Sequence, residues 1–70
     1  GGTFGIQIIL RLIHDSVHFL KNEGWLCFEV GLGQGPGILK YLIKNKHFSS
    51  ILTEKNENGD IRAILAQVKY

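Results

Sequence analysis

The chain has few of the features that would stabilise a small domain covalently or hold it in a membrane. Its 70 residues include one cysteine and no methionine, so no internal disulfide can form. A lone thiol is typical of a reducing compartment, and we expect a cytoplasmic location. No apolar run reaches the roughly 20 residues that a membrane-spanning helix needs, and the sequence opens without a signal-peptide pattern.

Charge of one sign is also scarce. The net charge is +2 at pH 7 and the lysines form no block, which disfavours a nucleic-acid partner. Seventy residues allow one small domain at most, and a chain of this size buries only about 60% of its unfolded surface. Because the chain opens with Gly-Gly-Thr and has no methionine, we interpret it as a single segment, residues 1–70, of a longer protein.

Two segments have the apolar spacing of amphipathic helices. In residues 6–21 an apolar stripe lies opposite a polar one, and Gly24 is expected to end this helix in the left-handed conformation. In residues 38–46 the apolar positions face inward and three lysines face outward. The stripes of the first helix are Ile6, Ile9, Leu10, Ile13, Val17 and Leu20 against Gln7, Arg11, His14, His18 and Lys21; those of the second are Ile38, Leu39, Leu42 and Ile43 against Lys40, Lys44 and Lys46.

Three further segments read as strands. Residues 25–30 are almost uniformly apolar, which is typical of a strand covered on both faces in a parallel sheet. Residues 48–54 are more polar and suit a sheet edge, whereas residues 61–68 suit its interior. Asn58-Gly59 predicts a hairpin between these two. The expected fold class is α/β with the order α-β-α-β-β, its last strand antiparallel and inserted between the other two.

The stretch EVGLGQG, residues 29–35, matches the loop by which class I methyltransferases hold S-adenosylmethionine. On that interpretation Glu29, Gly31, Gly33 and Gly35 bind the cofactor, and Glu54 accepts from the ribose hydroxyls. The hairpin at Asn58-Gly59, however, leaves no room for the helix that must link the second and third strands of such a unit. We therefore favour a turn over a cofactor cradle.

With these elements placed, the chain resembles one family more closely: the class I S-adenosylmethionine-dependent methyltransferases that modify the side-chain nitrogen of a glutamine in peptide chain release factors. The motifs are a Gly-Gly-x-x-Gly stretch, a Leu-Lys-x-x-Gly-Trp-Leu segment leading into Glu-x-Gly-x-x-Gln-Gly, and a closing glycine turn followed by arginine. Phe4, Asn56 and Ile61 depart from the family pattern, where acidic residues are usual. The matching residues are Gly1, Gly2, Gly5, Leu20, Lys21, Gly24, Trp25, Leu26, Glu29, Gly31, Gln34, Gly35, Gly59 and Arg62.

The resemblance implies that residues 1–70 are the C-terminal part of a Rossmann-like methyltransferase domain, containing its fifth to seventh strands. The parent enzyme would use S-adenosylmethionine and act on a release factor or a related protein. Its cofactor motif and its catalytic Asn-Pro-Pro-Tyr loop would lie upstream of Gly1, so the segment alone would bind no cofactor and have no activity. Glu29 and Gln34 would line the rim of the methyl-acceptor pocket; the alternative is that Glu29 accepts backbone N–H bonds and braces the loop.

Other candidate residues favour ordinary structural roles. His14 and His18 imitate a zinc-protease pair, with His47 as a third ligand, but they share the polar stripe and we expect no metal. Cys27 is expected in the core, and packing in the same strand explains the aromatic residues Trp25 and Phe28. A different class of function is a small interaction module that recruits a partner strand at residues 25–30.

Overall fold

The computed structural model describes residues 2–70, and their side chains from Gly5 onward. Gly1, which carries part of the resemblance, lies outside the described residues, as does the side chain of Phe4. The elements are α1 (Gly2–Ser16), β1 (Trp25–Glu29), α2 (Gly35–Lys44), β2 (Phe48–Lys55) and β3 (Ile61–Val68).

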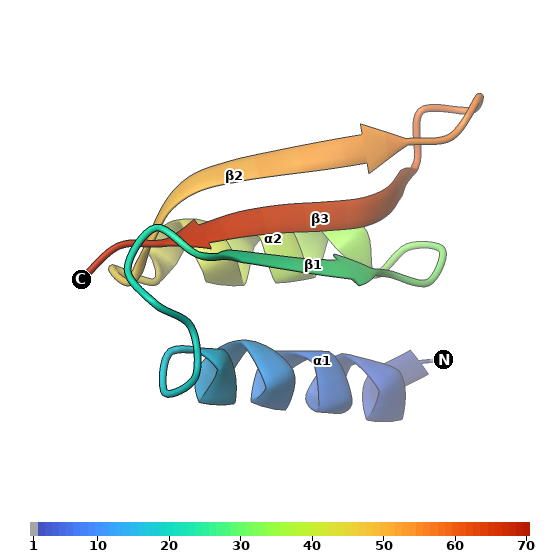
Figure 1. Ribbon diagram of the computed structural model, residues 1–70. Coiled ribbons are helices and arrows are strands. Elements are labelled where there is room, and N and C mark those ends of the chain that lie inside the picture. Colours follow the sequence, from blue (N-terminus) through green and yellow to red (C-terminus); the bar gives the residue numbers. More distant parts are fainter. Residues whose placement is uncertain (1) are drawn as a thin grey trace.

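The three strands form one sheet in the order β1-β3-β2 (Figure 1). β3 is antiparallel to both neighbours, so β1 and β2 run in the same direction and are separated by β3. This confirms the expected α/β class, the α-β-α-β-β order and the insertion of the last strand between the other two. β2 lies at an edge because its serines, threonine and glutamate tolerate solvent on one side.

The turn between β2 and β3 forms as its Asn-Gly signal predicts. Gly59 has a φ of +86°, a conformation that glycine adopts without steric cost. The side-chain Oδ1 of Asn56 accepts the backbone N–H of Asn58 at 2.9 Å and that of Asp60 at 3.0 Å. Asn56 thus supplies the acceptor oxygen that an aspartate would supply at this departure from the family pattern.

Both helices pack on the same face of the sheet. Ile13 of α1 joins Ile38 and Leu42 of α2 and Ile64 of β3 in one core, each at most 1% exposed. Alternate residues of β3 face this core, since side chains of a strand point to opposite faces in turn. The fully assembled core is Ile13, Ile38, Leu42, Phe48, Ile64, Ala66 and Val68.

The opposite face of the sheet is bare, which corrects the prediction that residues 25–30 are covered on both faces. In β1 the exposed residues alternate with half-buried ones, and Trp25 is 44% exposed. Cys27, expected in the core, is exposed as well. The composition of β1 is almost uniformly apolar and therefore calls for a covering layer on its second face. Residues 2–70 do not provide that layer.

Two helix predictions also need correction. α1 ends at Ser16, five residues before the predicted end, where the backbone tightens into turns: the His18 and Phe19 N–H groups donate to carbonyls three residues back, each at 3.0 Å. Glu23, with a φ of 70°, takes the left-handed conformation expected of Gly24. In α2, Ile43 was predicted inward but is 67% exposed, because the helix lies on the sheet by a narrower stripe through Ile38 and Leu42.

Candidate functional site

A hollow of about 200 Å³ lies at the end of the sheet where β1 and β2 terminate. Ala63 of β3 pairs with Glu29 on one side and with Glu54 on the other, so one row across the sheet reads glutamate, alanine, glutamate. The small central side chain between two long ones opens the hollow. β1 and β2 run in the same direction on either side of β3 and both end here; the carboxyl ends of such strands are where open α/β sheets bind ligands.

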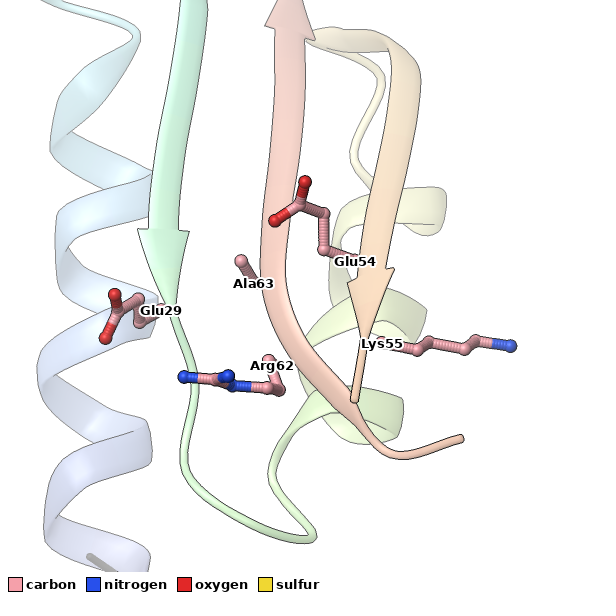
Figure 2. A pocket seen from close by; sticks show the side chains of 5 residues that line it. All are labelled: Glu29, Glu54, Lys55, Arg62 and Ala63. Carbon is pink, nitrogen blue, oxygen red and sulfur yellow. The ribbon is translucent and has the colours of Figure 1, made fainter. Parts of the chain in front are cut away.

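The charges around this hollow are mixed. Two carboxylates, of Glu29 and Glu54, and two cations, of Lys55 and Arg62, line it with Ala63. Figure 2 shows the Glu54 side chain turned toward β3 and Lys55 directed away from the sheet. Within residues 2–70 none of the four charged groups is held in an ion pair; the salt bridge recorded there joins His14 to Asp15. The hollow can therefore offer both hydrogen-bond acceptors and donors to a polar ligand.

Gln34 is not on the surface of this hollow but inside the loop after β1. Its side chain is 8% exposed, and its Oε1 accepts the backbone N–H of Gly31 at 2.8 Å. A Cβ built on Gly5 of α1 would lie 3.1 Å from Gln34 Nε2, so the Gln34 amide also lies against the first turns of α1. The bracing role that the sequence offered to Glu29 is performed by Gln34. Within the described residues the exposed Glu29 carboxylate accepts no hydrogen bond.

The glycines of EVGLGQG have structural reasons of their own. A Cβ at Gly31 would lie 2.9 Å from Gln34 Oε1, and one at Gly35 would lie 2.6 Å from the Cβ of Ile61. Gly33 has a φ of +81°, and the Gln34 N–H donates to the Gly31 carbonyl at 3.0 Å. These features form a tight turn in which two N–H groups are used internally.

The strand order also bears on the cradle interpretation. A dinucleotide-type unit places the strand after the glycine loop's helix beside the first strand, parallel to it. Here β3 separates β1 from β2, and Glu54 lies two strands away from Glu29 in the sheet. The interpretation in which Glu29, Gly31, Gly33 and Gly35 bind the cofactor needs a strand parallel to β1 and next to it. Within residues 2–70, β1 pairs with the antiparallel β3 instead.

The outer edge of β1 is open within the described residues. The Val30 N–H donates to the Arg62 carbonyl at 2.8 Å, and hydrogen bonding alternates along an antiparallel strand. The N–H and C=O groups of Trp25, Cys27 and Glu29 therefore point away from β3. The same residues carry the exposed side chains of β1. This strand is thus ready to accept another strand at its edge and a cover on its face.

The remaining candidates are dispersed. The rings of His14 and His18 lie 6.2 Å apart, but His18 follows the end of α1 instead of sharing its face. Among residues 2–70 no three histidine, cysteine or acidic side chains are grouped as metal ligands. No helix in the described part of the chain is long and apolar enough to cross a membrane.

The sequence brought Glu29 and Glu54 together only in the disfavoured cofactor-loop interpretation and did not predict that they flank one residue of the last strand. The hairpin pairs Lys55 with Ile61, and a register shift between Lys55 and Glu54 then aligns Glu54 with Ala63, so the turn signal alone does not give this alignment. The register of β1 depends on a contact between residues more than thirty positions apart, and no local pattern predicts it. The placement of Arg62 and Lys55 beside the hollow was likewise missed.

Comparisons with known proteins give one consistent result. The chain is 32% identical over 65 residues to a release factor glutamine methyltransferase of Vibrio cholerae, covering 93% of this chain and 22% of that protein. It is 27% identical over 67 residues to one of Thermosynechococcus vestitus, covering 96% and 23%, and 32% identical over 63 residues to one of Enterococcus faecalis, covering 90% and 23%. The resemblance that the motifs predicted is confirmed.

The chain spans less than a quarter of the length of these relatives. No family model matches it, and no solved structure gives a significant match.

Proposed function

We propose that this chain is the C-terminal part of a cytoplasmic, S-adenosylmethionine-dependent methyltransferase that modifies a glutamine side chain of a peptide chain release factor. The observation that carries the proposal is the strand order β1-β3-β2 with β3 antiparallel. The family resemblance implies this arrangement for the fifth, seventh and sixth strands. The similarity to three release factor glutamine methyltransferases supports it independently.

The bare surfaces of the sheet fit a place inside a larger domain. The outward backbone groups of β1 would pair with a strand from upstream chain, and an unpaired buried donor or acceptor costs about 1–3 kcal/mol. Trp25 is 44% exposed and Leu52 is 56% exposed; the same upstream chain would cover both side chains. In this proposal the cofactor-binding motif and the catalytic loop belong to that upstream chain. The present residues supply one side of the acceptor pocket.

The part of this chain in the reaction is to position the methyl acceptor. Glu29 lies at the carboxyl end of β1, is exposed, and lines the hollow. Its carboxylate can accept a hydrogen bond from an amide N–H₂ and hold the amide nitrogen toward a methyl donor. Gln34 contributes by holding the loop that follows Glu29, through its bond to Gly31. Such positioning is effective because a fixed geometry removes the entropy cost of bringing the reactants together.

A chimera tests the proposal. The aligned segment of the Vibrio cholerae relative is replaced by residues 1–70 of this chain, and methyl transfer from S-adenosylmethionine to a release factor is measured. We expect transfer by the chimera and none by the relative with the segment deleted. A chimera that unfolds cooperatively and binds S-adenosylmethionine but methylates no release factor would contradict the proposal.

Glu29 is tested within the same chimera. Glu29→Gln is expected to raise KM for the release factor with little change in the unfolding midpoint, because the side chain is exposed. Glu57→Gln, in the exposed turn between β2 and β3, is the matched control and is expected to leave KM unchanged. An unchanged KM in Glu29→Gln would remove this residue from the acceptor pocket.

A second candidate function is a small interaction module that binds a partner by adding a strand to β1. The open edge of β1 favours it.

Calorimetric titration of the isolated chain with S-adenosylmethionine separates the proposed function from the cofactor-loop interpretation. Micromolar binding of S-adenosylmethionine would favour the cofactor loop of residues 29–35, whereas the proposal above expects no binding.

A further inference from the structure

A second hollow, of about 360 Å³, lies between α1 and α2. We call it the helix groove. Its walls are Ile6 and Leu10 of α1 and Ile38 and Tyr41 of α2. Both helices lie on the covered face of the sheet, so this groove is remote from the hollow at Glu29 and does not depend on the proposed function. An apolar groove of this size falls within the usual range of binding sites.

The rim of the helix groove carries charge of one sign. Lys40 and Lys44 line it from α2, and residues four apart on a helix lie on the same side, about 6 Å apart along the axis. No acidic side chain lines this hollow, and neither lysine forms an ion pair within residues 2–70. The groove therefore offers an apolar floor flanked by two uncompensated cations.

Gly37 opens the groove further. It lies in the first turn of α2, where a Cβ would meet no atom within 4 Å, and it lines the hollow. Neither a positive φ nor close packing requires glycine at Gly37, whereas at Gly35, two residues earlier, Ile61 leaves no room for a side chain. Its lack of a side chain widens the groove at the end of α2.

We propose that the helix groove docks an acidic amphipathic helix of a partner protein. Apolar side chains of such a helix, spaced three and four apart, fit the apolar walls. Carboxylates along its flank pair with Lys40 and Lys44, and this charge complementarity selects the partner. A second copy of this chain is disfavoured as the occupant, because a symmetric contact would bring the two lysine rims together.

The test uses the chain and a labelled helical peptide of roughly 18 residues, about five helical turns, with leucines at the spacing above and glutamates beside them. Binding is measured by fluorescence anisotropy. A peptide with every glutamate replaced by glutamine is expected to bind at least about tenfold more weakly. Added salt is expected to weaken the acidic peptide selectively, because exposed charges are screened.

Variants locate the binding to the groove. Lys40→Glu with Lys44→Glu is expected to weaken binding at least about tenfold, and Gly37→Leu to do the same by filling the hollow. The matched control, Lys46→Glu with Lys69→Glu, changes the net charge equally outside the groove and is expected to bind as the unaltered chain does. Circular dichroism verifies that each variant is folded, and Gly37→Ala separates blocking of the groove from the loss of glycine.

Three outcomes would overturn the proposal. The first is equal binding of the acidic and the amide peptides, and the second is equal binding by the groove variants and the control. The third is an occupant of another kind. Dimerisation of the chain that Gly37→Leu abolishes would assign the groove to a second copy, and binding to phosphatidylglycerol vesicles without binding to the peptide would assign it to a membrane surface.

Discussion

The side-chain oxygen of Gln34 accepts the backbone N–H of Gly31 at 2.8 Å, from a position that is 8% exposed. This bond closes the loop after β1 and sets the direction in which the chain leaves Glu29. Gln34→Ala leaves the Gly31 N–H without its partner, and we expect a loss of about 1–3 kcal/mol in the free energy of unfolding, measured by urea denaturation.

The matched control is Gln67→Ala. Gln67 also bonds to a backbone group, donating to the Glu23 carbonyl at 2.9 Å, but in an exposed position, so we expect a change within about 0.5 kcal/mol. An equal loss in the free energy of unfolding in the two variants would mean that the buried Gln34–Gly31 bond stabilises the fold no more than the exposed bond of Gln67 does.

Gly35 and Gly37 have opposite requirements although both lie in the first turn of α2. A Cβ at Gly35 would lie 2.6 Å from the Cβ of Ile61, whereas one at Gly37 would meet no atom within 4 Å. We expect Gly35→Ala to destabilise the fold by about 1–3 kcal/mol through overpacking, and Gly37→Ala to be neutral or stabilising by up to about 1 kcal/mol. Thermal unfolding followed by circular dichroism measures both; destabilisation of the same size in each would show that the contact with Ile61 is not the cause.

The same substitution, isoleucine to valine, can be compared at a buried and at an exposed position of α1. Ile13 is fully buried and Ile8 is 58% exposed. We expect Ile13→Val to cost about 0.5–1.5 kcal/mol, because it removes a packed methylene, and Ile8→Val to change stability by less than about 0.5 kcal/mol. Equal effects in urea denaturation would show that α1 does not pack on the sheet by the face described above.

Asn56 is expected to tolerate aspartate but not alanine. Its Oδ1 accepts two backbone N–H groups of the turn, and a carboxylate oxygen can do the same. We expect Asn56→Asp to leave the unfolding midpoint nearly unchanged and Asn56→Ala to lose about 1 kcal/mol. A large loss in Asn56→Asp would mean that the amide nitrogen of Asn56 has a part in the turn.

Cys27 reports on what covers the sheet. Its thiol is exposed, so we expect rapid alkylation by a maleimide in the folded chain, followed by mass spectrometry of the peptide that contains it. In the chimera with the Vibrio cholerae relative we expect alkylation at least about tenfold slower, because the upstream chain would cover this face. Equally rapid alkylation in the chimera would leave the bare face unexplained by a larger domain.

Local patterns predicted most of the elements. The largely apolar composition of residues 61–68 predicted β3 with the bounds that the structure has, and the Asn58-Gly59 signal predicted the hairpin. The apolar stripe of α1 faces the core at Ile13 as predicted. The end of α1 at Ser16 could not be predicted from periodicity, because the apolar spacing continues through Val17 and Leu20 after the helix has ended.

The candidate site was predictable only in part. Glu29 and Gln34 stand out by their places in the motif, but the sequence offered the bracing role to Glu29 alone, and whether Gln34 has it instead is a question of structure. The answer depends on burial: Gln34 lies beneath the turn and against α1, whereas Glu29 lies on the open face of the sheet. Burial of a side chain is decided by neighbours far away in the chain, which a motif does not contain.

The sequence by itself determined the order of the elements, the hairpin and the resemblance to release factor glutamine methyltransferases, because each of these rests on residues close together along the chain. Only the tertiary structure decided that Glu29 and Glu54 flank Ala63 and that both helices share one face of the sheet. Those relationships arise from pairing and packing between distant segments, where the burial of apolar surface by the whole chain selects the arrangement.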